Sequence, residues 1–284
     1  MMRTALAMAF LVLAASSSAT AQSQTFASKV EAVRVDVLVT DKGRAVRGLQ
    51  AADFEILDNG MPQQVDLISF EQIPLNLVLV FDMSGSIVGE RLEHLRDGAR
   101  TVLSGLARED QAALVTFSEA VVRRSELTTN VEQVRAALTQ AGGRGDTALI
   151  DAVYTGMMVG ESDVGRALAI VFSDGLDTAS FLTPEVTLDT AKRSDVVVYA
   201  VVAGGSPKIP FLHDLSELTG GTFYDAGSTQ NLGATFVKIL NEFRQRYLVS
   251  YSPRGVSGEG WHRLEVRVKG RGVDVKARPG YFAN

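Results

Sequence analysis

Residues 75–86 read LNLVLVFDMSGS, and this stretch decides the fold. Its first seven residues are mostly apolar and rich in Leu and Val, which is typical of a strand buried on both faces in the middle of a parallel sheet. Asp82, Ser84 and Ser86 come directly after this run, and a helical pattern follows. Because ligand sites in open α/β sheets lie at the carboxyl ends of strands, this end is the first candidate site.

Asp82, Ser84 and Ser86 place three hard oxygen donors in one turn. Oxygen-only ligands select Mg²⁺, Mn²⁺ or Ca²⁺ over the softer metals that prefer His and Cys. The alternative is that Asp82 and Ser84 only cap the following helix, since both residue types suit an N-cap position. The buried strand in front of them favours the metal site.

Residues 78–86 (VLVFDMSGS) resemble the opening strand and the metal-ion-dependent adhesion site, or MIDAS, of von Willebrand factor type A (VWA) domains. That family completes the site with a Thr on a second loop and an Asp on a third. Here residues 145–149 (GDTAL) match the second loop, and residues 171–175 (VFSDG) match the third. The resemblance covers residues 74–243. It implies that the metal ligands are Asp82, Ser84, Ser86, Thr147 and Asp174.

Residues 1–21 have the three parts of a secretory signal peptide. Arg3 gives the positive start, residues 5–15 are apolar, and Ala19-Thr20-Ala21 is an A-x-A cleavage site. The apolar run is too short to span a bilayer, and no later segment is apolar for long enough to be a transmembrane helix. We therefore expect an exported protein, periplasmic or extracellular, that is cleaved near Ala21.

Composition excludes several classes of protein. The chain is 46% hydrophobic, which is enough for a sizeable core, and its formal net charge is −5. An acidic balance argues against nucleic-acid binding, which calls for clustered Lys and Arg. Cysteine is absent, so there is no disulfide framework, thiolate metal site or cysteine nucleophile.

Strand and helix patterns alternate from residue 74 to residue 245. The strand expected at 112–117 is followed so closely by the apolar pair at 121–122 that the two should form a hairpin. This hairpin would place one antiparallel edge strand beside an otherwise parallel sheet. The whole alternation predicts a doubly wound, mostly parallel sheet with helices on both faces.

The flanks of this region read as β structure. Residues 33–39 (VRVDVLV) carry an apolar side chain at every second position, which is typical of a half-buried strand. Residues 54–57 and 65–68 are expected to pair around the turn Asp58-Asn59-Gly60. In the C-terminal flank, residues 264–268 and 273–276 alternate in the same way across a turn.

Neither flank can form a stable sheet alone. We therefore predict that an N-terminal segment, 30–72, pairs with a C-terminal segment, 246–284, in one small antiparallel β domain. The VWA-like domain, 74–245, would be inserted between them. The ending ARPGYF at residues 277–282 is also similar to that of bacterial, acidobacterial-type members of the family.

The donor set itself suggests an adhesion-type mechanism. Three neutral hydroxyls coordinate a metal without cancelling its charge, so a metal with one direct Asp ligand keeps net positive charge and an open position. The family resemblance implies that a Glu or Asp of a protein partner fills that position. The alternatives are that Thr147 is only a helix N-cap and Asp174 only a turn residue before Gly175.

Three neighbouring motifs are given structural interpretations. Asp177 and Thr178 are read as turn residues, although they could line the rim of the site. Asp151 is read as a hydrogen-bond acceptor behind it. The tripeptide Arg144-Gly145-Asp146 spells an integrin-recognition sequence, but a three-residue match is weak and we assign it to loop geometry.

An enzyme is the rival class. The sequence has no Gly-x-Ser-x-Gly elbow, no Gly-x-x-x-x-Gly-Lys phosphate loop and no Gly-x-Gly-x-x-Gly. None of the three His residues is placed by the sequence near Asp82. We predict a secreted, non-enzymatic protein-binding module that depends on Mg²⁺, Mn²⁺ or Ca²⁺. The alternatives are a metal-assisted hydrolase and an accessory subunit of the magnesium-chelatase type, against which the export signal counts.

Overall fold

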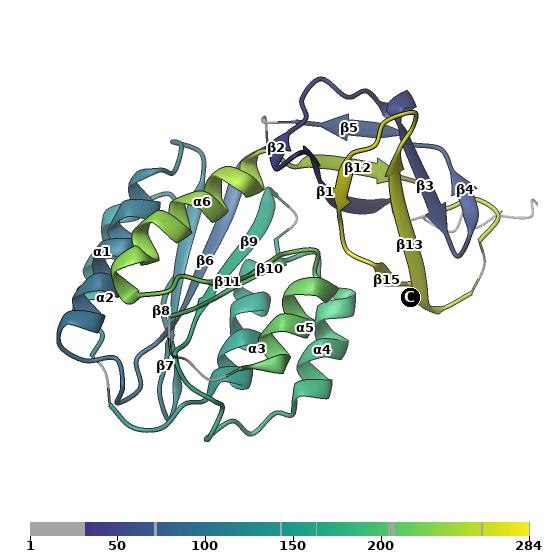
Figure 1. The fold of residues 1–284 in the computed structure, drawn as a ribbon. Coiled ribbons are helices and arrows are strands. Elements are labelled where there is room, and N and C mark those ends of the chain that lie inside the picture. Colours follow the sequence, from purple (N-terminus) through teal and green to yellow (C-terminus); the bar gives the residue numbers. More distant parts are fainter. Residues whose placement is uncertain are drawn as a thin grey trace, which may run out of the picture. The chain divides into compact units, whose positions relative to one another are not determined.

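The fold is organised around a six-stranded sheet with the strand order β11-β10-β9-β6-β7-β8 (Figure 1). The computed structural model describes residues 32–70, 73–142, 144–162, 164–203, 205, 208–256 and 258–283. The predicted signal peptide, 1–21, lies outside these residues. The strands of this sheet are β6 (Leu75–Asp82), β7 (Gln111–Phe117), β8 (Val121–Thr128), β9 (Arg166–Phe172), β10 (Val197–Val202) and β11 (Phe223–Asp225).

Strand β6 lies in the middle of the sheet and is buried over its whole length, as its mostly apolar run predicts. It pairs in parallel with β7 on one side and with β9 on the other. The parallel order continues through β10 and β11. Only β8 runs antiparallel to its neighbour β7, which confirms the predicted antiparallel edge strand.

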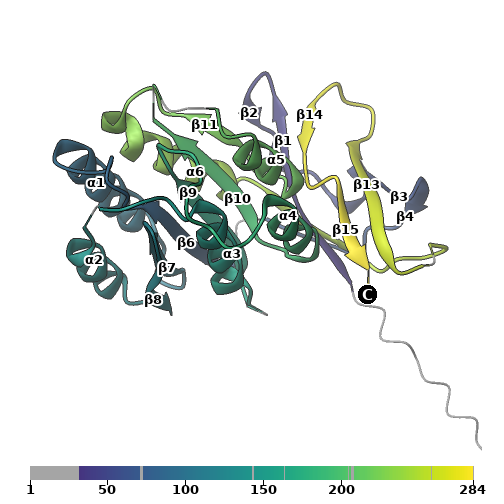
Figure 2. The same ribbon diagram turned by 90° about the horizontal axis from the view of Figure 1, so that it is seen from below.

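Helices cover both faces of the sheet (Figures 1 and 2). Leu77 and Leu79 of β6 point to one face and Val78 and Val80 to the other, because side chains alternate along a strand. The first face is covered by α1 (Glu90–Ser104), α2 (Val131–Gln140) and α6 (Leu232–Arg244). The second face is covered by α3 (Leu149–Gly160), α4 (Pro184–Arg193) and α5 (Pro210–Leu218).

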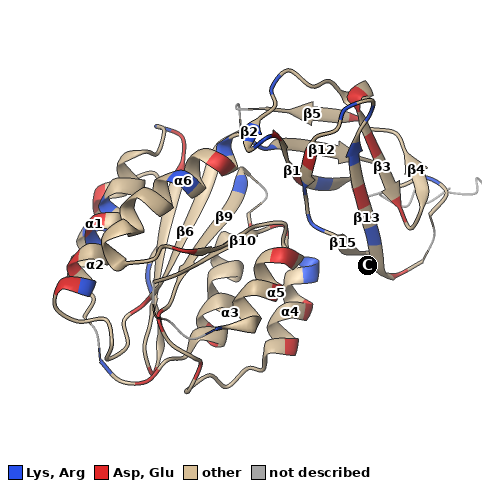
Figure 3. Cartoon of the chain, viewed as in Figure 1, with Lys and Arg blue, Asp and Glu red and all other residues tan. Residues whose placement is uncertain are grey.

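Charged residues occur on the helices and loops and also on strands of the flanking sheets, such as β13 (Figure 3). Strands β6 and β10 are drawn almost without charge, whereas α1 carries residues of both signs. No helix within the described ranges is both long and apolar enough to cross a bilayer.

The two flanks form two further antiparallel sheets. One has the order β14-β1-β12-β5, with β2 also paired to β1, and the other has the order β15-β13-β3-β4. The N-terminal strands are β1 (Val33–Asp41), β2 (Arg44–Ala45), β3 (Phe54–Asp58), β4 (Met61–Gln63) and β5 (Leu67–Ser69). The C-terminal strands are β12 (Tyr247–Tyr251), β13 (Gly260–Val268), β14 (Asp274–Lys276) and β15 (Gly280–Ala283).

Strands from both ends of the chain pair in each of these sheets. In one sheet β1 lies beside β12, and in the other β3 lies beside β13. The apolar side chains of both sheets share one core, which includes Val35, Val37 and Val39 together with Leu264 and Val268. Residues 33–39 and 264–268 therefore lie in two sheets over a common core, and not in a single sheet. Alternating patterns cannot separate these cases, because every second residue faces inward in both.

The hairpin predicted at Asp58-Asn59-Gly60 is present, but its second strand differs from the predicted one. Asn59 and Gly60 have φ of 47° and 82° and form a two-residue turn, so the residues that pair with β3 are the next ones, Met61–Gln63. The predicted partner, residues 65–68, contributes to β5, which pairs with β12. The strand predicted at 273–276 contains β14, which pairs with β1.

Candidate metal site

Asp82 ends the central strand and is completely buried. Its Oδ1 accepts a hydrogen bond from the backbone N–H of Ser84 at 2.8 Å. Its Oδ2 accepts one from the hydroxyl of Ser173, on the loop after β9, at 2.7 Å. Both carboxylate oxygens are thus held in place from two different loops.

Burial is the largest influence on this carboxyl, and it raises the pKa of Asp82 above its ordinary value. The negative charge of Asp174 also raises this pKa, while the hydrogen bonds from Ser84 and Ser173 lower it. A buried carboxylate beside a second carboxylate is an environment that a bound cation would stabilise.

The two serines of the first loop connect Asp82 to the third loop. The hydroxyls of Ser84 and Ser86 lie 3.2 Å apart. Ser86 donates a hydrogen bond to Oδ1 of Asp174 at 2.6 Å. The Asp174 side chain is only 4% exposed, so it is a second nearly buried carboxylate at the same edge of the sheet.

Backbone hydrogen bonds hold the second loop against the other two. The N–H of Gly85 donates to the carbonyl oxygen of Gly145 at 3.0 Å, which joins the first loop to the second. The N–H of Thr178 donates to the carbonyl oxygen of Thr147 at 2.9 Å, which joins the second loop to the third. A Cβ placed on Gly175 would lie 3.7 Å from the Thr147 hydroxyl oxygen. All five residues singled out in the sequence therefore lie on loops at one edge of the sheet.

The helix-capping alternative does not fit these positions. Helix α1 begins at Glu90 with Gly89 at its N-cap, so neither Asp82 nor Ser84 caps it. Helix α3 has Ala148 at its N-cap and no side-chain cap from Thr147. None of these three side chains therefore caps α1 or α3.

Two carboxylates behind the site brace its loops. Asp177 accepts a hydrogen bond from the N–H of Ile150, in the first turn of α3. Asp151, read from the sequence as a hydrogen-bond acceptor, accepts from the N–H groups of Phe181 and Leu182 at 2.9 Å each. These bonds fix the loop between β9 and α4 against α3.

Sequence reasoning missed Arg91 and Ser173. Nη1 of Arg91, in the first turn of α1, donates to Oδ2 of Asp174 at 2.7 Å. Nothing in the sequence distinguishes Arg91 from the other arginines of this helix, since its contact depends on tertiary structure. Ser173 lies within the motif of the third loop, but the family pattern has a ligand position only at its neighbour Asp174.

The candidate site contains only two acidic side chains, because its other proposed ligands are hydroxyls. Within the part of the chain that the structure describes, no three His, Cys, Asp or Glu side chains form a metal-binding group. The candidate site instead combines two carboxylates with three hydroxyls. Neutral and charged oxygen donors together suit hard divalent cations.

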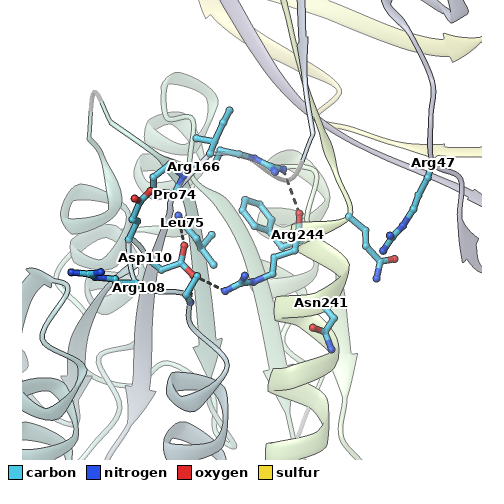
Figure 4. A pocket seen from close by; sticks show the side chains of 13 residues that line it. Arg47, Pro74, Leu75, Arg108, Asp110, Arg166, Asn241 and Arg244 are labelled. Atoms are coloured by element: carbon cyan, nitrogen blue, oxygen red, sulfur yellow. Dashed lines mark hydrogen bonds and ion pairs between the residues drawn. The ribbon is translucent and has the colours of Figure 1, made fainter.

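The described residues also line a pocket of about 600 Å³ at the opposite edge of the sheet, where β6 and β9 begin (Figure 4). Arg166 forms an ion pair with Asp36, and Arg244 forms one with Asp110. Asp110 also accepts a hydrogen bond from the N–H of Leu75, the first residue of β6. Arg166 and Arg244 are two of the four arginines that line the pocket, and we interpret their ion pairs as structural support for the start of the central strand.

This chain belongs to the von Willebrand factor type A domain family. The model of that family matches residues 76–238, which is more than half of the chain and includes all three loops of the site. The fold and the arrangement of the loops are those expected from the resemblance seen in the sequence.

Individual relatives are distant. Inter-alpha-trypsin inhibitor heavy chain H4 of Bos taurus is 22% identical over 230 residues, which are 74% of this chain and 25% of that protein. A structure of proximal thread matrix protein 1 from the mussel byssus, with a zinc-occupied MIDAS motif, has 16% identity and a TM-score of 0.56. That match covers 66% of this chain and 49% of the mussel chain.

A von Willebrand factor type A structure from Catenulispora acidiphila is also similar. It has 12% identity and a TM-score of 0.53, and the match covers 81% of this chain and 72% of that chain. The chain thus spans about a quarter of the curated relative and about half of the mussel protein. At these identities the similar structures establish the fold alone.

Proposed function

We propose that this protein is a secreted, non-enzymatic binding module that holds a divalent metal and uses it to bind an acidic side chain of a protein partner. The observation that supports this proposal is the hydrogen-bonded chain Ser84–Ser86–Asp174 beside the buried Asp82 at the carboxyl edge of the sheet, with Thr147 on a loop bonded to the same third loop. The proposed ligands are Asp82, Ser84, Ser86, Thr147 and Asp174. Mg²⁺, Mn²⁺ and Ca²⁺ are the ions whose oxygen preference fits them.

The chemistry of the site supports a role in binding. The hydroxyls supply coordination without charge, so a metal with one direct Asp ligand keeps positive charge and a position for an outside ligand. A carboxylate of a partner is the natural occupant of that position. VWA domains generally mediate protein–protein interactions, and the mussel relative of similar fold has zinc at its MIDAS.

A metal-assisted hydrolase would need a general base beside the ion. The three histidines are engaged elsewhere: His94 is hydrogen-bonded to Thr229, His213 lies beside Asp214, and His262 is bonded to Asp58. None of these partners belongs to the proposed metal site. The binding module is therefore favoured over the hydrolase.

Exposed apolar side chains on the loops of the same edge support a protein as the partner. Phe181 is 95% exposed, although Asp151 fixes its backbone, and Leu176 and Val88 are each 51% exposed. Leu176 and Phe181 follow β9, and Val88 follows β6. A partner segment that carries apolar residues beside its Glu or Asp would fit this edge.

The proposed function is tested by metal-dependent capture. Immobilised protein loaded with Mg²⁺ is exposed to envelope and culture-medium extracts, washed and eluted with EDTA. A specific partner should elute from the wild type and be absent from an Asp82→Asn column. Equal recovery from both columns would contradict the proposal, and turnover of esterase or phosphatase substrates would favour the hydrolase.

Thr147→Ala should weaken metal binding without abolishing it. The variant keeps both carboxylates and loses one hydroxyl ligand, so we expect affinity to fall about tenfold, the equivalent of one lost hydroxyl interaction. Calorimetric titration with Mn²⁺ measures this. Thr147→Ser, which keeps the hydroxyl, is the matched control and should bind close to wild type. Unchanged affinity in Thr147→Ala would remove this residue from the site.

Phe181→Ala should weaken capture of the partner and leave metal binding unchanged. Exposed aromatic side chains often contribute strongly to interfaces, so we expect the amount eluted by EDTA to fall about tenfold. Trp261→Ala is the control, because Trp261 is an exposed aromatic on β13, outside the VWA region. Equal losses in both variants would argue against a partner surface at the metal edge.

A further inference from the structure

Arg91 makes an unusual contact for a residue at the edge of a metal site. Its guanidinium binds Oδ2 of Asp174 at 2.7 Å, while Ser86 binds Oδ1 of the same carboxylate at 2.6 Å. The two contacts use different oxygens. Arg91 can therefore stay in place when a metal occupies the side of the carboxylate that faces the serines.

Arg91 changes the net charge of the site, which contains two carboxylates. Asp82 and the Asp174 side chain are almost inaccessible to solvent, so their charges are poorly screened. Arg91 is half-exposed and contributes one positive charge against these two negative ones. A divalent ion would leave this group with a net positive charge, whereas the two carboxylates alone would only neutralise the ion.

We propose that Arg91 is a specificity-determining residue that makes the metal-loaded site select a carboxylate. Its charge opposes uptake of the free ion and favours an anionic ligand once the ion is bound. This inference rests on the proposed function, since it concerns the same metal and the same acidic partner. Arginine keeps its charge at all accessible pH values, so the effect does not depend on titration.

The test uses the thermodynamic reciprocity between metal binding and carboxylate binding. If the metal increases the affinity for a carboxylate, the carboxylate must increase the affinity for the metal by the same factor. Acetate is the carboxylate probe, and chloride at matched ionic strength is the reference anion. Mn²⁺ affinity is measured by calorimetry in each buffer, and the ratio of the two affinities reports the coupling.

Two substitutions separate charge from structure. Arg91→Met keeps the aliphatic part of the side chain and removes the charge, and Arg91→Lys keeps the charge. Arg100→Met is the matched control, because Arg100 lies on the same helix, is similarly exposed and forms a similar ion pair with Asp97. Thermal unfolding without metal checks that each variant is folded.

In wild type, acetate should tighten Mn²⁺ binding. In Arg91→Met, binding in chloride should be about three to ten times tighter than in wild type, and the acetate effect should be smaller by a similar factor, because the metal itself still attracts acetate. Arg91→Lys should restore most of the coupling, and Arg100→Met should match wild type. Equal coupling in wild type and Arg91→Met, or no coupling in wild type, would overturn the role of Arg91 while leaving the metal site intact. Absence of Mn²⁺ binding in wild type would overturn the proposed function itself.

Discussion

Asp82→Asn is expected to abolish the binding of Mg²⁺ and Mn²⁺ while the fold is retained. Asp82 is the proposed anionic ligand that the central strand fixes most firmly, since it is fully buried and bonded at both oxygens. The amide keeps an acceptor for the N–H of Ser84 and can donate to Ser173, but it carries no charge. Asp82→Ala should lose the metal in the same way.

Calorimetric titration and thermal unfolding measure this effect. A bound metal stabilises wild type by RT ln(1 + [L]/Kd), about 2.7 kcal/mol at a hundredfold excess over Kd, and the variant should show no such shift. Asp110→Asn is the matched control, because Asp110 is also a buried carboxylate but lies at the opposite edge of the sheet. The ligand assignment fails if Asp82→Asn binds metal as tightly as wild type.

Arg246→Met is expected to reduce the free energy of unfolding by about 3–5 kcal/mol. Arg246 follows α6, precedes β12 and is completely buried. Its Nη2 donates to the Tyr199 hydroxyl at 2.8 Å and to the carbonyl oxygen of Gly220 at 2.6 Å. Tyr199 in turn donates to Glu242 at 2.7 Å. Removing the guanidinium leaves the buried carbonyl oxygen of Gly220 and the Tyr199 hydroxyl without their donor.

Methionine fills a similar volume, so the variant isolates the polar interactions from the packing. Urea unfolding of metal-free protein gives the free energy, and metal affinity should be unchanged because the hydrogen-bond partners of Arg246 are Tyr199, Gly220 and Asp36, none of which is a proposed ligand. The control Arg100→Met removes an exposed ion pair and should cost less than about 1 kcal/mol. A loss of similar size in both variants would show that the buried arginine contributes little.

The strands of the central sheet could be predicted because their patterns are strong. Residues 77–81 are continuously apolar, and the short gap between β7 and β8 leaves only a hairpin. The flanking sheets were harder, because β4, β5 and β14 are only three residues long. Such short segments carry too few apolar positions to indicate which strand they pair with, and their pairing is decided by residues distant in the sequence.

In the candidate site, too, the residues in local motifs could be predicted and those that depend on tertiary contacts could not. Asp82, Ser84 and Ser86 are adjacent in sequence at a strand end, and Thr147 and Asp174 lie in motifs similar to those of a known family. Arg91 could not be found in this way, because its role depends on how the first turn of α1 lies against the loop after β9. The bracing of Phe181 by Asp151 likewise joins two elements that no local pattern connects.

Locating the metal in a crystal tests the proposed metal site most directly. Crystals grown with Mn²⁺ and measured at the manganese absorption edge give an anomalous difference map that shows the ion itself. We predict one strong peak bounded by the side chains of Asp82, Ser84, Ser86, Thr147 and Asp174. A strong peak elsewhere with none at these loops, or no peak in crystals saturated with Mn²⁺, would contradict it.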